Sequence, residues 1–244
     1  MSLAEAPSLS AHTRKVRVVY DDLQPHFARW TPSANFRSIF ARTVLDEIHR
    51  VLARVQRVRI LEVGCGHGTW AEEIYRQIKN PEQRMDYLGI DLSSVRIADA
   101  QQRLAAYPGV QVFVADSETF QPPGPVDLIL AIEVLDHVPR RRYAAWLAQW
   151  RQWLVPGGAF VVIDKERFSR HALRISVEQF QRRFCPWLTR RSRGYFPQEY
   201  RELVSTLAYP GFARLSRLAR RTGFISLPVV RHDMFHALIA RRPA

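Results

Sequence analysis

The sequence predicts an α/β fold: a doubly wound, mostly parallel sheet of seven strands that ends in an antiparallel hairpin. Three patterns predict it. Short apolar runs without polar alternation recur along the chain, which is typical of strands covered on both faces. Segments with apolar residues at helical spacing separate these runs, as in sheets built of parallel strands and crossover helices. Near the C-terminus, two apolar runs are joined by a turn too short for a parallel connection.

The elements follow in order from these patterns. Residues 16–56 are predicted to be helical, because apolar side chains recur there in steps of three and four. The alternation that follows has strands over 58–63, 87–92, 110–115, 126–134 and 159–163, and helices over 69–78, 95–107 and 140–154. Ser93 or Ser94 is expected to cap the second of these helices. Pro156, Gly157 and Gly158 are expected to end the third.

The last part of the chain completes the sheet. Strands over 224–230 and 234–240 are expected to pair through a turn at 231–233. The long crossover before them is predicted to be helical where it is periodic. The expected organisation is an N-terminal helical lid (1–56), a core (57–164), a basic helical insertion that caps the substrate (165–223) and the hairpin (224–244).

Composition excludes several protein classes. With 244 residues and 47% hydrophobic content, the chain suits one large globular domain. Its longest apolar run, over 128–135, is too short to cross a bilayer, and the first 20 residues show no secretory signal. Cys65 and Cys185 cannot form a disulfide framework, so we expect a reduced, cytoplasmic protein. No cysteine–histidine spacing suggests zinc, and no metal is predicted.

The positive charge is concentrated in the C-terminal part. Residues 140–244 hold 21 basic and 6 acidic groups, against 15 and 17 in the rest of the chain. The arginines of the insertion are interleaved with aromatic residues, among them Phe180, Phe184, Trp187, Tyr195, Phe196 and Tyr200. Arg140, Arg141 and Arg142 begin a helix, where cations oppose the helix dipole. A site for an acidic substrate and a solvated arginine cluster both explain that placement.

A glycine-rich turn is the decisive motif. The first predicted strand runs through Glu62 and Val63 into Gly64, Gly66 and Gly68, and then into a helix. Such a turn brings a ligand close to bare backbone at a helix N-terminus, but its spacing is not that of the dinucleotide motif. Two acids end the next strands: Asp91 is placed to accept from ribose hydroxyls and Asp116 to meet an adenine amino group. All of them lie where parallel strands end, which is where this architecture binds ligands.

On these residues the sequence resembles the class I S-adenosylmethionine-dependent methyltransferases, and more narrowly their broad branch containing quinone-biosynthesis and sugar methyltransferases. The resemblance covers residues 57–164 and the terminal hairpin, and further matches lie at 134–139 and 154–158. It implies a Rossmann-like methyltransferase fold, S-adenosylmethionine as the cofactor, and a cofactor-binding core over 57–164.

The resemblance also implies a set of site residues. The glycines of the turn would line the methionine moiety, Asp91 the ribose and Asp116 the adenine, with Tyr20 closing over the cofactor and Arg37 reaching the methionine carboxylate. The implied cofactor-binding residues are Tyr20, Arg37, Glu62, Gly64, Cys65, Gly66, Gly68, Asp91, Leu92, Asp116, Ser117, Glu133, Val134 and Leu135.

Two residues are candidates for catalysis. His137 is the first candidate for a general base, because its segment ends beside the implied cofactor and imidazole titrates near neutral pH. Glu133 is the second. A packing role for His137 and a hydrogen bond from Glu133 to the cofactor are the alternatives. Positioning alone removes much of the barrier to an in-line displacement, so this family often has no obligatory catalytic residue.

The favoured function is methyl transfer to a small-molecule or lipid-linked acceptor that is anionic. An RNA methyltransferase is an alternative, since arginines interleaved with aromatics suit a phosphate backbone and stacked bases. The fourth predicted strand, however, ends in residues 133–136 without the Asn/Asp-Pro-Pro-aromatic motif of enzymes that methylate base amines. A non-catalytic cofactor-binding or membrane-surface module is a third hypothesis. We see no strongly apolar face opposite the arginines, and the oligomeric state is left open.

Overall fold

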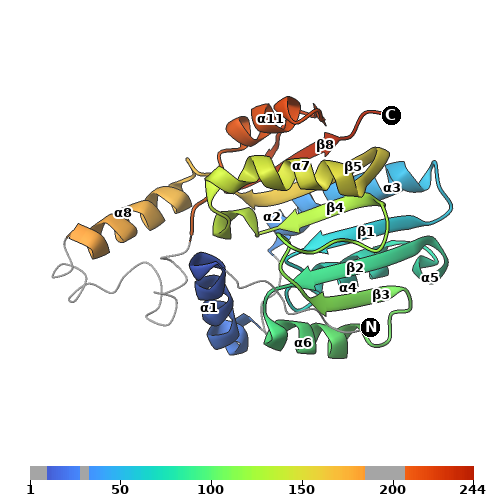
Figure 1. Ribbon diagram of the computed structural model, residues 1–244, viewed down its shortest axis with the longest axis horizontal. Helices are drawn as coiled ribbons and strands as arrows, with labels where there is room; N and C mark the ends of the chain where they lie inside the picture. Colours follow the sequence, from blue (N-terminus) through green and yellow to red (C-terminus); the bar gives the residue numbers. More distant parts are fainter. Residues whose placement is uncertain (1–9, 28–32, 185–206) are drawn as a thin grey trace.

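An eight-stranded sheet forms the centre of the protein (Figure 1). The computed structural model describes residues 10–27, 33–184 and 207–244. The strands are β1 (Val58–Val63), β2 (Met85–Asp91), β3 (Val110–Val114), β4 (Val126–Ile132), β5 (Leu154–Lys165), β6 (Ile225–Ser226), β7 (Val230–His232) and β8 (Phe235–Arg241). Their order is β3-β2-β1-β4-β5-β8-β6, and β7 also pairs with β8. Strands β1 to β5 are parallel and β8 is antiparallel to its neighbours, which confirms the predicted fold class.

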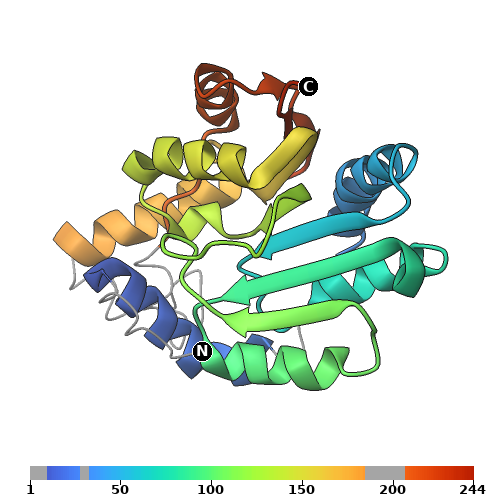
Figure 2. The same ribbon diagram turned by 45° about the vertical axis from the view of Figure 1, so that its right-hand side comes forward.

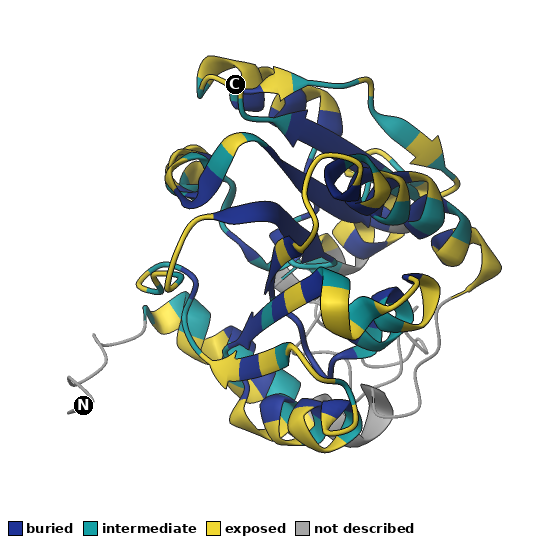
Figure 3. Ribbon diagram, turned by 90° about the vertical axis from the view of Figure 1, so that its right-hand side faces the viewer, coloured by how far each residue is buried: buried dark blue, intermediate teal, exposed yellow. Residues whose placement is uncertain are grey.

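Helices cover both faces of the sheet (Figures 1 and 2). The described helices are α1 (Ala11–Phe27), α2 (Ala34–Phe40), η1 (Ala41–Leu45), α3 (Asp46–Leu52), α4 (Thr69–Gln77), α5 (Pro81–Arg84), α6 (Ser94–Leu104), η2 (Leu135–His137), η3 (Arg140–Arg142), α7 (Tyr143–Trp153), α8 (Arg170–Phe184) and α11 (Phe212–Arg221). Apolar side chains of α2, α3, α4 and α6 share one core with the sheet, and those of α7 and α11 share the other. The central strands are therefore buried on both sides (Figure 3), as their continuous apolar runs predict.

Strand register brings the functional segments together. Val63 at the end of β1 lies opposite Ile90 of β2 and Ala131 of β4. The residues that follow these strands therefore emerge at one edge of the sheet. Helix α1 lies across this edge, and α8 projects from the same end of the molecule (Figures 1 and 2).

The strand predicted over 224–230 is interrupted. Leu227 still donates its N–H to Ile239, but Pro228 has no N–H to continue the ladder. The segment therefore splits into β6 and β7, and the sheet has eight strands rather than seven. Strand β5 is longer than predicted, because residues 155–158 form an irregularity inside the strand, where the pairing with β4 changes register.

The helices also differ from the sequence-based boundaries. The predicted helix over 140–154 begins as the 3-10 turn η3 before α7, and the N-terminal helical region contains a π-helical stretch, η1. Helix α5 was not predicted. The capping prediction for Ser93 is confirmed, since its hydroxyl accepts from the N–H of Arg96 (3.1 Å).

Part of the basic insertion lies outside the described residues. This applies to Cys185 and to the predicted aromatic and basic residues Trp187, Arg190, Arg191, Arg193, Tyr195, Phe196 and Tyr200. None of the helices in the described ranges is long and apolar enough to cross a membrane.

Candidate active site

A cavity opens at the edge of the sheet where the parallel strands end, with an empty volume of about 780 Å³ that includes its opening to solvent. Residues after β1, β2, β3 and β4 line it, and α1 adds His12, Val16 and Tyr20. Because each wall comes from a different element, the cavity exists only when the sheet and α1 are assembled.

The glycine turn forms the floor beside β1. Gly64 lines the cavity and adopts a φ of +73°, and a Cβ at this position would lie 2.5 Å from the side chain of Val134. Its N–H and that of Cys65 donate to the carbonyl of Ile90 (2.7 and 3.0 Å), which ties the turn to β2. Only glycine meets both demands, since a side chain would be strained and would clash.

Asp91 is fixed by backbone donors. One carboxylate oxygen accepts from the N–H of Gly66 and the other from the N–H of Ser93, each at 2.9 Å. The guanidinium of Arg96 lies 3.9 Å away. Asp91 is buried and lines the cavity, so its carboxylate is held in one orientation at the end of β2.

Arg96 was not predicted as a site residue. Its guanidinium lies over the ring of Tyr20, 4.7 Å from the centroid. It also covers Gly66, where a Cβ would come within 2.5 Å of Nη2. A signal was present in the sequence, because Arg96 stands in the first turn of the helix that follows Asp91.

Asp116 and Ser117 line the far side of the cavity, after β3. Asp116 is half-buried and accepts from the N–H of Glu118 (2.9 Å). Burial raises the pKa of this carboxyl, against the effect of that hydrogen bond. Leu92 and Val134 complete this part of the lining.

Glu133 stands at the end of β4 in a left-handed conformation, with a φ of +54°. Such a conformation is costly for a residue other than glycine and is found most often at functional sites. Its carboxylate forms an ion pair with Lys165 of β5 and lines the cavity.

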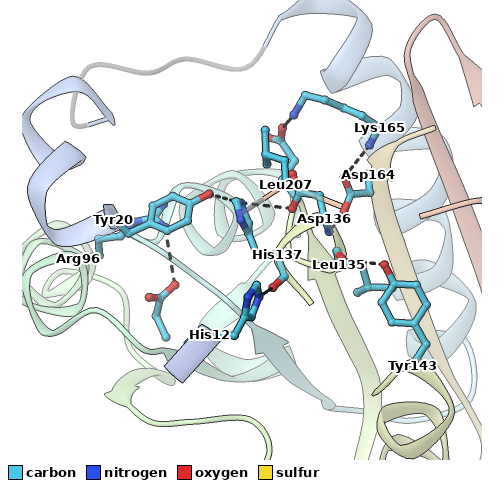
Figure 4. A network of polar contacts seen from close by, with 12 residues as sticks. His12, Tyr20, Arg96, Leu135, Asp136, His137, Tyr143, Asp164, Lys165 and Leu207 are labelled. Carbon is cyan, nitrogen blue, oxygen red and sulfur yellow. Dashed lines mark hydrogen bonds and ion pairs between the residues drawn. The ribbon is translucent and has the colours of Figure 1, made fainter. Parts of the chain in front are cut away.

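His137 is the centre of a polar network (Figure 4). Its Nε2 lies 2.6 Å from the hydroxyl of Tyr20, and its carbonyl accepts from Nε2 of His12 (2.7 Å). Both partners come from α1, more than 100 residues away in sequence. Burial lowers the pKa of His137 and raises that of Tyr20, so both groups are neutral at pH 7.

A buried acid pair lies behind this histidine, and sequence analysis did not single it out. Asp136 and Asp164 are both buried, and Asp164 accepts from the N–H groups of Asp136 (3.0 Å) and Lys165 (2.7 Å). Burial, followed by the charge of Asp136, raises the pKa of Asp164 well above its usual value. The two acids brace the turn that carries His137.

Several predicted residues lie away from the cavity. Arg37 is exposed on α2, outside the lining. Glu62 is fully buried and accepts from the hydroxyl of Tyr87, and Cys65 packs beside Gly89. Leu135 belongs to the core on the α7 side, and Gly68 packs against Leu104 at the start of α4.

Comparisons with known proteins agree with this geometry. Residues 61–160 match the family model of a methyltransferase domain. A trans-aconitate 2-methyltransferase of Methylobacterium nodulans is 35% identical over 115 residues, which cover 46% of this chain and 41% of the relative. A malonyl-[acyl-carrier protein] O-methyltransferase of Ilyobacter polytropus is 32% identical over 76 residues, covering 31% and 27%. A methyltransferase domain thus accounts for residues 61–160, and these matches support the resemblance to the class I S-adenosylmethionine-dependent methyltransferases.

Solved structures share the fold of this chain. The magnesium protoporphyrin IX methyltransferase of Synechocystis, solved with bound S-adenosylhomocysteine, superposes with a TM-score of 0.64 at 16% identity, covering 95% of this chain and 99% of that one. The [4+2]-cyclase SpnF superposes equally well, with a TM-score of 0.64 at 16% identity and 98% coverage of both chains. Since a cyclase shares it, the fold does not define the reaction. The matched segments span less than half of the first two curated relatives.

The cavity suits an adenosyl cofactor. Gly64 places bare backbone in the cavity wall, and the fixed carboxylate of Asp91 is an acceptor for vicinal hydroxyls. Asp116 offers a half-buried carboxyl on the opposite wall. The residues present therefore fit S-adenosylmethionine.

Proposed function

We propose that the protein transfers a methyl group from S-adenosylmethionine to a small-molecule or lipid-linked acceptor that bears an anionic group. The observation that carries this proposal is the fixed carboxylate of Asp91 beside Gly64, in a cavity at the edge where the parallel strands end. The relatives support the acidic acceptor by their names, since trans-aconitate and malonyl groups are both carboxylates.

The cofactor would be held by residues of the cavity wall. Asp91 would accept from the ribose hydroxyls, Asp116 and Ser117 would contact the adenine, and Gly64 with Arg96 would face the methionine part. When bound, S-adenosylmethionine supplies an electrophilic methyl group on a sulfonium. The walls made by Tyr20 and Val134 exclude water from the reacting atoms.

His137 is the proposed base where the acceptor atom carries a proton. Its low pKa keeps the imidazole neutral, and the hydrogen bond with Tyr20 fixes the ring in the cavity wall. Glu133 is the second proposed catalytic residue, and its ion pair with Lys165 orients its carboxylate. An acceptor carboxylate is already ionised at neutral pH, so His137 would then position the acceptor rather than take a proton.

Calorimetric titration with S-adenosylhomocysteine tests the proposal. We expect one site per chain, and Asp91→Ala should weaken binding roughly 10- to 100-fold, because a charge-assisted hydrogen bond is lost. Asp86→Ala is the matched control: Asp86 lies on the same strand, is half-exposed and pairs with Arg57. Absence of binding by the native chain, or equal binding by both variants, would refute the proposal.

A further inference from the structure

A second cavity lies beside the first, between α8 and residues 207–209. Its volume is about 1090 Å³. Arg140 and Arg167 line it together with apolar side chains, including Leu173 and Ile175 of α8. The turn over 137–140 separates the two cavities: His137, Val138 and Pro139 line the first, and Arg140 lines the second.

The three arginines of η3, just before α7, lie in three different environments. Arg140 donates from Nε and Nη2 to the carbonyl of Tyr209 (3.2 and 2.8 Å) and faces the second cavity. Arg142 forms an ion pair with Glu118, and Arg141 is exposed. Only one of the three therefore has a carboxylate partner among the described residues.

The described lining of the second cavity carries positive charge without a balancing acid. Among the described residues, the lining contains no Asp or Glu, and neither Arg140 nor Arg167 forms an ion pair. Burial, followed by the nearby charges of Arg167 and Arg214, lowers the pKa of Arg140. A bound anion would relieve this repulsion and the cost of burying Arg140.

Apart from Ser176, Gln179 and Tyr209, the rest of the described lining is apolar. Ala172 and Ile175 of α8 line the second cavity and are buried. Phe168, which precedes α8, and Leu173 also line this cavity but are 82% and 64% exposed. Exposed apolar side chains continue along α8 at Val177, Phe180 and Phe184. The spacing of these residues puts them on one face of the helix, so an exposed apolar face runs along the helix that lines the second cavity.

We infer that the second cavity binds a non-reacting anionic group of the methyl acceptor, a carboxylate or phosphate attached to an apolar chain. This inference rests on the proposed function. The arginines would hold the oxyanion through charge-assisted hydrogen bonds, and the apolar chain would lie against α8. A short, fully polar polyanion would leave the apolar wall in contact with water.

Calorimetry with simple probes tests this inference. The full chain, saturated with S-adenosylhomocysteine, is titrated at low salt with sodium decanoate, decyl phosphate or trans-aconitate. We expect one of the two amphiphiles to bind once per chain, which also distinguishes carboxylate from phosphate. Arg140→Gln and Arg167→Gln should each weaken that binding roughly tenfold or more, whereas the exposed Arg141→Gln should leave it unchanged. Leu173→Gln should weaken the amphiphile severalfold.

Several outcomes would overturn the inference. These are no binding of either amphiphile, equal binding by all variants, or tight binding of trans-aconitate that depends on Arg140 alone. Flotation of the protein with phosphatidylglycerol vesicles, without binding of decanoate or decyl phosphate, would show that the apolar face of α8 contacts a membrane instead. Retained S-adenosylhomocysteine binding in the Arg140 and Arg167 variants separates failure of this inference from failure of the proposed function.

Discussion

Single residues in this site carry two constraints at once. Gly64 must adopt a left-handed backbone and leave room for Val134, and Asp91 must accept two backbone hydrogen bonds while facing the cavity. The sequence predicted both residues, because a glycine turn and an acid at a strand end are local patterns. The partner of each was not predicted, since Val134 and Arg96 reach them through space.

Replacing Gly64 tests the first constraint. In Gly64→Ala, the new Cβ would meet Val134 at 2.5 Å on a backbone with φ of +73°. We expect the free energy of unfolding to fall by about 1–3 kcal/mol, together with loss of S-adenosylhomocysteine binding. Denaturant titration and calorimetry measure the two effects. Gly124→Ala is the control, because a Cβ at that residue would have no atom within 4 Å and stability should not change.

The burial of His67, in the glycine turn that contains Gly64, predicts that the free energy of unfolding depends on pH. Burial, followed by the charges of Arg96 and Arg103, lowers the pKa of His67 from 6.5 to about 4. The unfolded chain therefore takes up a proton below pH 6.5 that the folded chain takes up only near pH 4. The free energy of unfolding should fall across this window, by up to about 3 kcal/mol from this residue.

Denaturant titrations between pH 7 and pH 4 measure this contribution. The His67→Gln variant should show a shallower loss of stability than the native chain. His49→Gln is the control, because His49 lies on α3 and is not part of the turn. Parallel curves for the native chain and His67→Gln would contradict the assignment.

At the scale of elements, α1 acts as a wall of the active site. Tyr20 and His12 contact His137, and the carboxylate of Asp21 accepts from the hydroxyl of Ser93. The sequence predicted a helical lid and the position of Tyr20, but not its contact with His137. That contact joins residues 117 positions apart, and helical periodicity carries no information about such a pair.

Amide hydrogen exchange tests the role of α1. Bound S-adenosylhomocysteine should slow exchange in α1, because the ligand adds contacts to an element held by a few polar bonds. Asp21→Ala should speed exchange in α1 of the free protein, whereas the exposed neighbour Asp22→Ala should not. Unchanged exchange in α1 on ligand binding would show that this helix is not coupled to the site.

The whole molecule is electrostatically divided. The C-terminal 105 residues carry all of the excess positive charge, since the rest of the chain has more acidic than basic groups. In the described ranges, part of this charge is neutralised or buried: Arg142 pairs with Glu118, Arg241 pairs with Glu47, and Arg140 lines an apolar cavity. Arginines used in this way do not form a track for a phosphate backbone.

We therefore expect the protein to bind RNA weakly and with little preference for the RNA sequence. We expect the slope of log K against log salt to stay below about one, because few phosphates would be contacted at once. Filter binding of a structured RNA over a range of salt concentrations measures this slope. A slope of several units would favour the RNA methyltransferase hypothesis over the proposed acceptor.

The sequence by itself determined the alternation of strands and helices in the core, the glycine turn and the acids near the carboxyl ends of β2 and β3. These features are local: apolar periodicity and turn chemistry specify each element, and parallel strands place their ends on one edge. Only the tertiary structure decided that Tyr20 reaches His137, that Arg96 lies over Gly66, that Arg37 faces solvent and that Arg140 faces a second cavity. Each of these contacts and orientations depends on how separate elements pack and on the side-chain rotamer that this packing allows. No local sequence pattern encodes such an arrangement.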